Sequence, residues 1–329
     1  MSRLRVAVAV PATSDFATLR EACRLAEEGG FDAYTRPDHL LAEGVLGTPG
    51  APLLECFTTL GALIASTSRL RFVQTVACNS FRNPALLAKM VASLDVISGG
   101  RMELGLGAGW LRQEYEAYGY EFPSPEVRLA QLREALQVVK LLWTGGPVDY
   151  AGEHYTLRGA VCAPRPVQQP RPPILVGGGG TGLLAVAAAE ADIVNVVPPT
   201  SHGAASQDAV RRFTLERFQR KAARVRSLAE TAGRDPATLS LSAMFFVQIA
   251  SSEAESRTLV DGIATRYRLT PAEAERFPLA LIGTPAQLRE RLAERIALLG
   301  VDYVVLQFAT LEPLARFAAE VLPALRPRR

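Results

Sequence analysis

Short apolar runs alternate with longer amphipathic segments along almost the whole chain, and residues 71–110 show the pattern most clearly. A buried strand is predicted first, and Asn83 with Pro84 then supplies an N-cap and a first-turn proline for a helix. Gly99 and Gly100 permit the left-handed backbone that ends a helix. The apolar residues between these signals fall at helical spacing and give one stripe that can lie on a sheet: Leu87, Met90, Val91, Leu94 and Ile97. With a second strand after the glycines, the stretch predicts a complete βαβ unit.

The same alternation extends from one end of the chain to the other. Strands are expected in residues 5–10, 31–40, 71–77, 102–110, 174–180, 192–199, 241–250 and 302–308. Helices are expected over residues 17–28, 53–66, 84–98, 125–143, 181–190, 206–232, 252–268 and 271–277, and a last long helix is capped by Thr284 and Pro285. Eight strands alternating with helices, without a shift in composition, predict one (β/α)8 TIM barrel domain over residues 1–329.

Two segments depart from the alternation. Residues 147–160 predict a hairpin that turns at Ala151 and Gly152, so they form an insertion in the barrel. Residues 163–173 carry five prolines and can be neither a helix nor a central strand. A doubly wound open sheet is the alternative fold, but residues 11–15 (PATSD) stand where its dinucleotide-binding glycine motif would follow the first strand.

Composition limits the partners and the compartment. The 36 basic and 33 acidic residues give a net charge of +3, which is too balanced to indicate nucleic acid or a membrane surface. Small molecules and other subunits are therefore the expected partners. The four cysteines form no CxxC pair and are expected to be reduced core thiols. Since no signal-peptide pattern opens the chain and no apolar run is long enough to span a membrane, a cytoplasmic location is expected.

In a barrel, the residues that follow each strand carry the chemistry, and four such places stand out. Asp38 and His39 follow the second strand, where the imidazole can serve in acid–base catalysis or be structural. The small, polar run Ala77–Phe81 follows the third strand and suits the edge of a ring, or is simply a loop. Gly107, Ala108, Gly109 and Trp110 end the fourth strand, where a floor for a ligand and a tight turn with a packed aromatic both fit. Side chains missing at Gly105, Gly107 and Gly109 predict the close approach of a flat ligand to this strand.

The fourth place is Gly177, Gly178, Gly179 and Gly180, which follow a strand and open a helix. Such a turn presents backbone N–H groups and the positive end of a helix, which suits a phosphate. The Lys-Ser/Thr pair of a nucleotide-hydrolysing P-loop is missing. His39, His154 and His202 are scattered along the sequence and form no metal-binding pattern. The GxSxG motif of a serine nucleophile is also missing.

Several motifs together carry a resemblance to a known family. The motifs are PDH at residues 37–39, FRNPALLAKMVASLDVISGGR, LGLGAGW followed by EYEAYG, and PPILVGGGG. The chain resembles the bacterial luciferase-like family, most closely its branch that uses the deazaflavin coenzyme F420. The resemblance implies a (β/α)8 barrel that binds F420 or FMN, with hydride transfer for the deazaflavin or oxygen activation for FMN.

The resemblance also assigns roles to particular residues. Asp38 and His39 match the pair beside the redox ring, with His39 as the catalytic residue. The strand-three region that props the ring, often through a non-proline cis peptide, is matched by Thr75, Val76, Ala77, Cys78 and Asn79. Gly107, Ala108 and Gly109 match the floor of the site, and Gly177, Gly178, Gly179 and Gly180 match the phosphate loop. Trp110 and Glu43 stand where the sugar-phosphate dehydrogenases of the branch carry glutamate and tryptophan, so the substrate stays open.

Three functions remain open at this point. The first is an F420-dependent oxidoreductase acting on a small organic substrate, and the second is an FMN-dependent monooxygenase that uses reduced flavin and O2. A separate flavin or F420 reductase is a possible partner. The third is a catalytically inactive cofactor-binding barrel, because a fold alone does not guarantee chemistry. The resemblance further implies a homodimer through the second and third helices, to which Leu63, Ile64, Met90 and Leu94 could contribute apolar surface.

Overall fold

Eight parallel strands close into a barrel in the computed structural model, which describes residues 3–11, 15–42, 50–198 and 211–325. The strands are β1 (Arg5–Ala9), β2 (Ala33–Arg36), β3 (Arg71–Gln74), β5 (Met102–Gly107), β8 (Ile174–Gly178), β9 (Ile193–Val196), β10 (Ser240–Ile249) and β12 (Tyr303–Phe308). Each pairs in parallel with the next in this order, and β12 pairs with β1 to close the ring. The predicted barrel is confirmed, and the open sheet is excluded.

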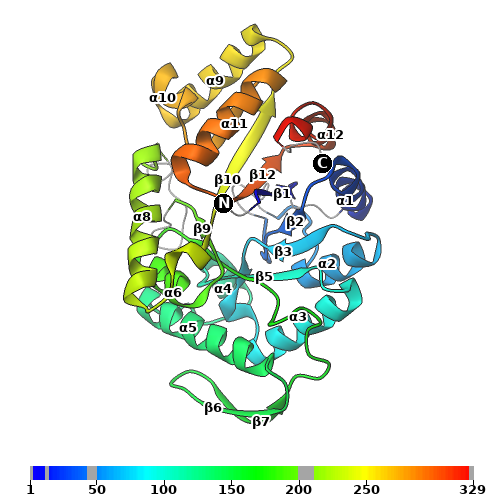
Figure 1. Cartoon of the computed structure of the whole chain (residues 1–329), viewed down its shortest axis with the longest axis vertical. Helices are drawn as coiled ribbons and strands as arrows, with labels where there is room; N and C mark the ends of the chain where they lie inside the picture. The colour runs from blue at the N-terminus through cyan, green and yellow to red at the C-terminus, as the bar shows by residue number, and fades with distance from the viewer. Residues whose placement is uncertain (1–2, 12–14, 43–49, 199–210, 326–329) are drawn as a thin grey trace.

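A ring of helices surrounds the strands (Figure 1). Its members are α1 (Phe16–Gly29), α2 (Cys56–Ala65), α3 (Pro84–Ser98), α5 (Pro125–Leu142), α6 (Thr181–Glu190), α8 (Leu215–Thr231), α11 (Pro285–Leu299) and α12 (Leu311–Glu320). The expected signals begin and end them: the Asn83 side chain accepts from the backbone of Ala85, Gly99 has φ 65°, and Thr284 forms a capping box with Gln287. The sequence pattern did not predict α12.

Two predicted helices start later than expected because a side chain caps them. The helix predicted from residue 53 begins at Cys56, where the Glu55 carboxylate accepts from the backbone N–H groups of Phe57 and Thr58. The described part of the helix predicted over residues 206–232 begins at Leu215, because Thr214 has extended backbone and caps it. Residues 206–210 of that prediction lie outside the described residues.

Smaller elements are added to the barrel. The predicted insertion forms an antiparallel hairpin of β6 (Pro147–Ala151) and β7 (Thr156–Val161), which projects below α5 in Figure 1. At the other end of that view, α9 (Glu253–Tyr267) and α10 (Pro271–Glu275) lie beside α11. The strands β4 (Ala77–Cys78) and β11 (Ala280–Gly283), the helix α4 (Arg112–Ala117) and single 3-10 turns at Asn79–Phe81, Pro236–Thr238 and Leu322–Leu325 complete the described elements.

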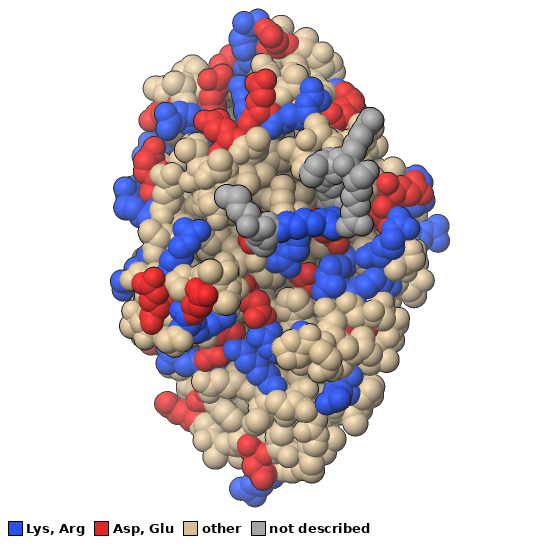
Figure 2. Space-filling view, viewed as in Figure 1, with Lys and Arg blue, Asp and Glu red and all other residues tan. Residues whose placement is uncertain are grey.

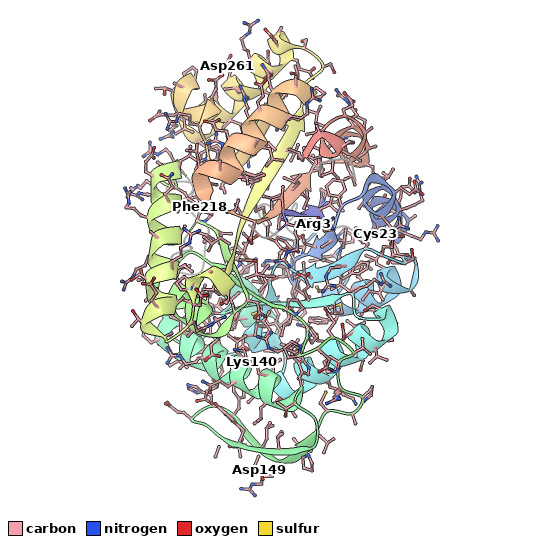
Figure 3. The ribbon with its side chains drawn as sticks, in the orientation of Figure 1. Arg3, Cys23, Lys140, Asp149, Phe218 and Asp261 are labelled. Carbon is pink, nitrogen blue, oxygen red and sulfur yellow. The ribbon has the colours of Figure 1, made fainter. Side chains whose placement is uncertain are left out.

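A network of charged side chains closes the end of the barrel at which the strands begin. Glu103 is fully buried there, with Arg71 Nε 2.7 Å and Arg5 Nη1 3.7 Å from one carboxylate oxygen, while the Tyr303 hydroxyl donates to the other at 3.4 Å. Lysine and arginine side chains gather near the middle of the face shown in Figure 2, and Arg3, just before β1, lies in the middle of Figure 3. A ligand must therefore enter from the opposite end.

Two further observations concern the cysteines and the helices. Cys23, Cys56, Cys78 and Cys162 are all free and buried, as expected of reduced core thiols. No helix in the described part of the chain is both long and apolar enough to cross a membrane.

Candidate active site

A cavity of about 520 Å³ lies at the carboxyl ends of the barrel strands. Thirteen of the fourteen residues predicted for the site line it: Asp38, His39, Thr75, Val76, Ala77, Cys78, Gly107, Ala108, Gly109, Gly177, Gly178, Gly179 and Gly180. The strand order β2-β3-β5-β8 separates His39 from the glycines by three inter-strand steps, or about 14 Å along the rim. The cavity therefore suits an elongated ligand, and the binding roles of these residues stay predictions.

Asn79 is the predicted residue that does not line the cavity. Its side chain is buried, and its Nδ2 donates to the Tyr155 hydroxyl at 3.2 Å. Tyr155 lies in the connection between β6 and β7. Asn79 thus ties the inserted hairpin to the end of the third barrel strand, and the prediction that it contacts a cofactor gains no geometric support.

His39 pairs with Glu114, not with its neighbour Asp38. Its Nδ1 lies 2.9 Å from Glu114 Oε2, and its ring packs edge-on against Trp110 with centroids 5.6 Å apart. Asp38 turns away and makes a two-point ion pair with Arg82, at 2.6 and 3.0 Å.

Glu114 determines which ring nitrogen of His39 carries the hydrogen. The other carboxyl oxygen, Oε1, accepts from the backbone N–H groups of Leu40 at 2.7 Å and Leu41 at 3.0 Å. With Glu114 held as an acceptor, the 2.9 Å contact is satisfied when His39 Nδ1 is the donor. Nε2 then remains for the cavity, and no side chain among the described residues bonds to it. The pair can hold or move a proton at Nε2.

The back wall of the cavity is made by Val76. The Thr75–Val76 peptide is cis, in agreement with what the family resemblance implied. A Cβ added to Gly107 would lie 2.6 Å from one Val76 methyl group, and a Cβ added to Gly177 would lie 2.8 Å from the other. Val76 alone therefore accounts for glycine at position 107, and the contact of Gly107 with a flat ligand stays a prediction.

The other two glycines of that strand are also explained by protein atoms. A Cβ on Gly105 would lie 1.7 Å from the backbone oxygen of Gln74. At Gly109, which has φ 77°, it would lie 1.8 Å from the Tyr115 hydroxyl. The prediction of close backbone approach was right, but the approaching groups belong to the chain.

The opposite end of the cavity contains the N-terminus of α6. Gly180 is the N-cap of α6 and contributes no side-chain hydrogen bond, so the first N–H groups of this ten-residue helix lack an internal partner. Lys221 on α8 reaches the same turn, donating to the backbone oxygen of Gly179. Burial, followed by the nearby charge of Arg217, lowers the pKa of Lys221. Positive charge therefore borders the turn from two helices.

Arg128 adds an unpaired cation to the cavity lining. Its side chain is only 9% exposed and lies 3.9 Å over the Phe122 ring, while Nε and Nη1 are buried without an acceptor. Burial lowers the pKa of Arg128, as expected for a desolvated cation. An uncompensated buried charge is costly, and an anionic ligand would relieve that cost. This observation shows that the site fits a ligand with a phosphate group.

Sequence reasoning missed Arg128 and the pairing of Glu114 with His39. Arg128 occupies the same helix face as Leu132, Ala135 and Val139, so a charged residue in an apolar stripe was the available signal. Glu114 had no such signal, because it meets His39 only when α4 folds back over the end of β2. In the part of the chain that the structure describes, His, Cys, Asp and Glu form no group able to hold a metal ion.

Cys78 also faces the cavity but is chemically quiet. Its thiol lies 3.1 Å from the Tyr115 hydroxyl, which in turn donates to Ser80 at 2.9 Å. Burial raises the pKa of the Cys78 thiol from 9.0 to about 11. Thiolate is the reactive form, so Cys78 should resist alkylation in the folded protein near neutral pH.

The raised pKa of Cys78 predicts a loss of stability in alkali. Between pH 9 and about 11 the unfolded thiol ionises and the folded one does not, so the free energy of unfolding falls as the pH rises. From pH 8 to pH 10, urea denaturation should show a fall about 1 kcal/mol larger in the parent than in Cys78→Ala. Equal falls in the two proteins would contradict this account.

The structure is thus a (β/α)8 barrel with an open helix N-terminus at one end of its cavity and an imidazole–carboxyl pair at the other. The family model of luciferase-like monooxygenases matches residues 1–303. The chain belongs to this luciferase-like family.

Relatives in the family include enzymes of both cofactor types. An uncharacterized protein of Mycobacterium tuberculosis is 36% identical over 173 residues, covering 49% of this chain and 60% of that protein. An FMNH2-dependent dimethylsulfone monooxygenase of Pseudomonas putida is 25% identical over 93% of this chain and 87% of that protein. An F420-dependent glucose-6-phosphate dehydrogenase of Amycolatopsis mediterranei is 33% identical over 47% and 45%. The chain spans only about half the length of several relatives that it matches.

Solved structures share the fold over the whole chain. An F420-dependent secondary alcohol dehydrogenase covers 99% of this chain and 100% of its own, with a TM-score of 0.77 and 19% identity. EDTA monooxygenase from Chelativorans sp. BNC1 covers 98% and 93%, with a TM-score of 0.81 and 17% identity. At these identities the likeness concerns the fold alone.

Proposed function

We propose that the protein is an F420-dependent oxidoreductase that transfers a hydride between the deazaflavin and a small organic substrate. The observation that carries this proposal is Arg128, a buried cation whose Nε and Nη1 lack an acceptor and which lines the same cavity as the open N-terminus of α6. F420 and FMN share a phosphate that these groups would hold. F420 adds an acidic tail. Lys221 of α8 donates to the backbone oxygen of Gly179, and the charge of Arg217 is near Lys221, so these two cations favour the more negative cofactor.

The chain's own residues supply position and proton transfer in this proposal. When bound, the deazaflavin supplies the hydride chemistry. Gly180, the first amides of α6 and Arg128 would hold its phosphate, and Val76 would support the ring from behind. His39, oriented by Glu114, would hold or accept the substrate proton at Nε2.

An FMN-dependent monooxygenase is the second candidate. It is favoured by the dimethylsulfone monooxygenase of Pseudomonas putida, whose sequence aligns with 93% of this chain. In that case reduced flavin would come from a separate reductase, which becomes the expected protein partner.

Titration with F420 and with FMN distinguishes the two candidates. Trp110 lines the cavity and should report binding by fluorescence, whereas Trp143 is buried with its Nε1 bonded to Ala88 and should give a constant background. We expect F420 to bind at least about tenfold more tightly than FMN, and Arg128→Gln to weaken both. Tighter binding of FMN would favour the monooxygenase, and binding of neither would contradict both proposals.

We also propose a homodimer, although the residues first named for its interface need correction. Leu63, Ile64 and Leu94 are buried in the hydrophobic core and Met90 is partly buried against it, so these side chains are already covered within one chain. Ile97 and Leu86 on α3 are 64% and 54% exposed and supply outward apolar surface. Sedimentation that shows only monomer at micromolar concentration would exclude this assembly.

A further inference from the structure

The part of the cavity wall that contains Val76 lies outside the regular strand pairing. β3 pairs with β2 as far as Gln74, and pairing resumes in β4, which lies beside β5. Thr75 and Val76 lie between the two paired stretches. The position of this part of the wall therefore depends on contacts other than the regular ladders.

Both ends of this stretch are bonded to the end of β2. The N–H of Thr75 donates to the backbone oxygen of Arg36 at 3.0 Å. At the other end, the N–H of Cys78 donates to Oδ2 of Asp38, also at 3.0 Å. A side-chain carboxylate thus takes the place of a backbone carbonyl at the second contact. Asp38 can support the wall only as firmly as its own carboxylate is held.

Arg82 holds the carboxylate of Asp38. Its Nη1 and Nη2 donate to the two oxygens of Asp38 at 2.6 and 3.0 Å, and Nη2 also donates to Glu55 at 2.6 Å. The guanidinium lies 4.5 Å over the Phe57 ring of α2. Burial favours the neutral form, but the hydrogen bond and charge of Asp38 offset it and raise the pKa of Arg82 above its ordinary value. A planar guanidinium bonded at two points fixes the orientation of a carboxylate as well as pairing its charge.

Arg82 itself is not among the described residues that line the cavity, whereas Asp38, Val76 and Cys78 are. It can therefore act on a bound molecule only through Asp38. Without the guanidinium, Asp38 would be a buried carboxylate that has lost its counter-ion, which is costly. The end of β2 and the Cys78 segment would then rearrange to hydrate it.

We propose that Arg82 is a positioning residue of the cavity. By holding Asp38 it fixes the backbone of Cys78, and with it the Val76 wall against which a bound ring would lie. The inference rests on the proposed function only for the identity of the ligand, because the contacts that link Arg82 to the Cys78 backbone lie within the protein.

Labelling of Cys78 tests this link without any cofactor. The folded protein is treated with iodoacetamide at about pH 8, and the modified cysteines are identified by peptide mass spectrometry. Cys78 should react at least about tenfold faster in Arg82→Gln than in the parent, because the freed segment opens more often. Cys23 of α1 and Cys162 after β7 are the internal controls, since both are buried and should stay unreactive.

Two further variants separate the contact with Asp38 from a general effect of the substitution. Glu55→Gln is the matched control, because it removes the other carboxylate bonded to Arg82 and leaves an oxygen that can cap α2. In this variant Cys78 should react as slowly as in the parent. Arg82→Lys keeps the charge but cannot reproduce the two-point contact, so it should give an intermediate rate. If Arg82→Gln does not fold, the comparison of Arg82→Lys with Glu55→Gln decides the same question.

Cofactor affinity tests the effect on the cavity. F420 and FMN are titrated against each variant with Trp110 fluorescence as the signal. Whichever cofactor the parent binds should bind at least about tenfold more weakly to Arg82→Gln, with an intermediate affinity in Arg82→Lys and the parental affinity in Glu55→Gln. If the parent binds neither cofactor, the proposed function fails, and the labelling of Cys78 alone decides whether Arg82 positions the wall.

Three outcomes would overturn the proposal. The first is labelling of Cys78 that is no faster in Arg82→Gln, or that is accelerated equally in Glu55→Gln. The second is joint acceleration of Cys23, Cys78 and Cys162, which would show that Arg82 stabilises the whole fold. The third is parental cofactor affinity in an Arg82→Gln protein whose Cys78 reacts rapidly. That result would show that the wall does not position a ligand, and it would leave the proposed function intact.

Discussion

Replacing His39 with alanine is expected to lower turnover about a hundredfold or more while F420 affinity stays nearly unchanged. The loss is the usual range for a general acid or base, and His39 Nε2 is the group of the His39–Glu114 pair left free toward the cavity. Steady-state rates are compared per folded molecule, and F420 affinity is measured by Trp110 fluorescence. Imidazole in the buffer should restore part of the rate, which a purely structural role would not allow.

Two variants make the result on His39 specific. His154→Ala is the matched control, because His154 lies in the β6–β7 connection away from the cavity, and it should keep full activity. Glu114→Gln should lose activity without losing F420 affinity. The backbone of Leu40 and Leu41 holds the amide oxygen, so the amide NH2 would face His39 Nδ1 and move the hydrogen to Nε2. A normal rate per folded molecule in His39→Ala would assign the histidine a structural role.

Gly180→Asp is expected to weaken cofactor binding by up to about a thousandfold without destabilising the fold. A carboxylate about 4 Å from a phosphate is opposed by about 4 kcal/mol at an effective dielectric constant of 20. The position has φ −76° and nothing within 4 Å of an added Cβ, so the side chain causes no strain or clash. Aspartate is moreover a favourable N-cap, so the melting temperature should stay equal or rise slightly.

Gly180→Asn is the matched control for this prediction. Asparagine caps the helix as well as aspartate does but adds no charge, so it should retain most of the affinity that aspartate removes. Gly178 is less suitable for this test, because an added Cβ there would lie 2.7 Å from the Leu183 side chain. If Gly180→Asp binds F420 and FMN as tightly as the parent protein, the turn does not hold a phosphate.

The barrel could be predicted from the sequence because its signals are local. A buried parallel strand such as β8 is a continuous apolar run, and Asn83 with Pro84 marks a helix start within two residues. The pattern missed the four-residue strand β11, and it also missed α12, although α12 is as long as the predicted α6. It placed thirteen site residues at one cavity because the carboxyl ends of parallel strands share one edge of the barrel.

The connections within the site could not be predicted, because they depend on three-dimensional packing. Asp38 is next to His39 in sequence, yet Glu114, 75 positions away, is the residue that reaches its ring. The pairing depends on how α4 folds back over the end of β2, and the hydrophobic periodicity of the sequence does not predict that arrangement. Glycines gave the opposite kind of error, since they correctly signalled close packing at Gly105 and Gly109 but not which atoms pack there.

The closeness of one Val76 side chain to both Gly107 and Gly177 has a consequence for which substitutions this chain can accept. Each glycine lacks room for a methyl group while valine stands at position 76, so neither can acquire a side chain by a single step. A smaller residue at position 76 would make room beside both glycines. The effects of substitutions at the three positions are therefore expected to be non-additive. A side chain at position 107 on β5 or 177 on β8 should be accepted only after valine at position 76 has been replaced by a smaller residue.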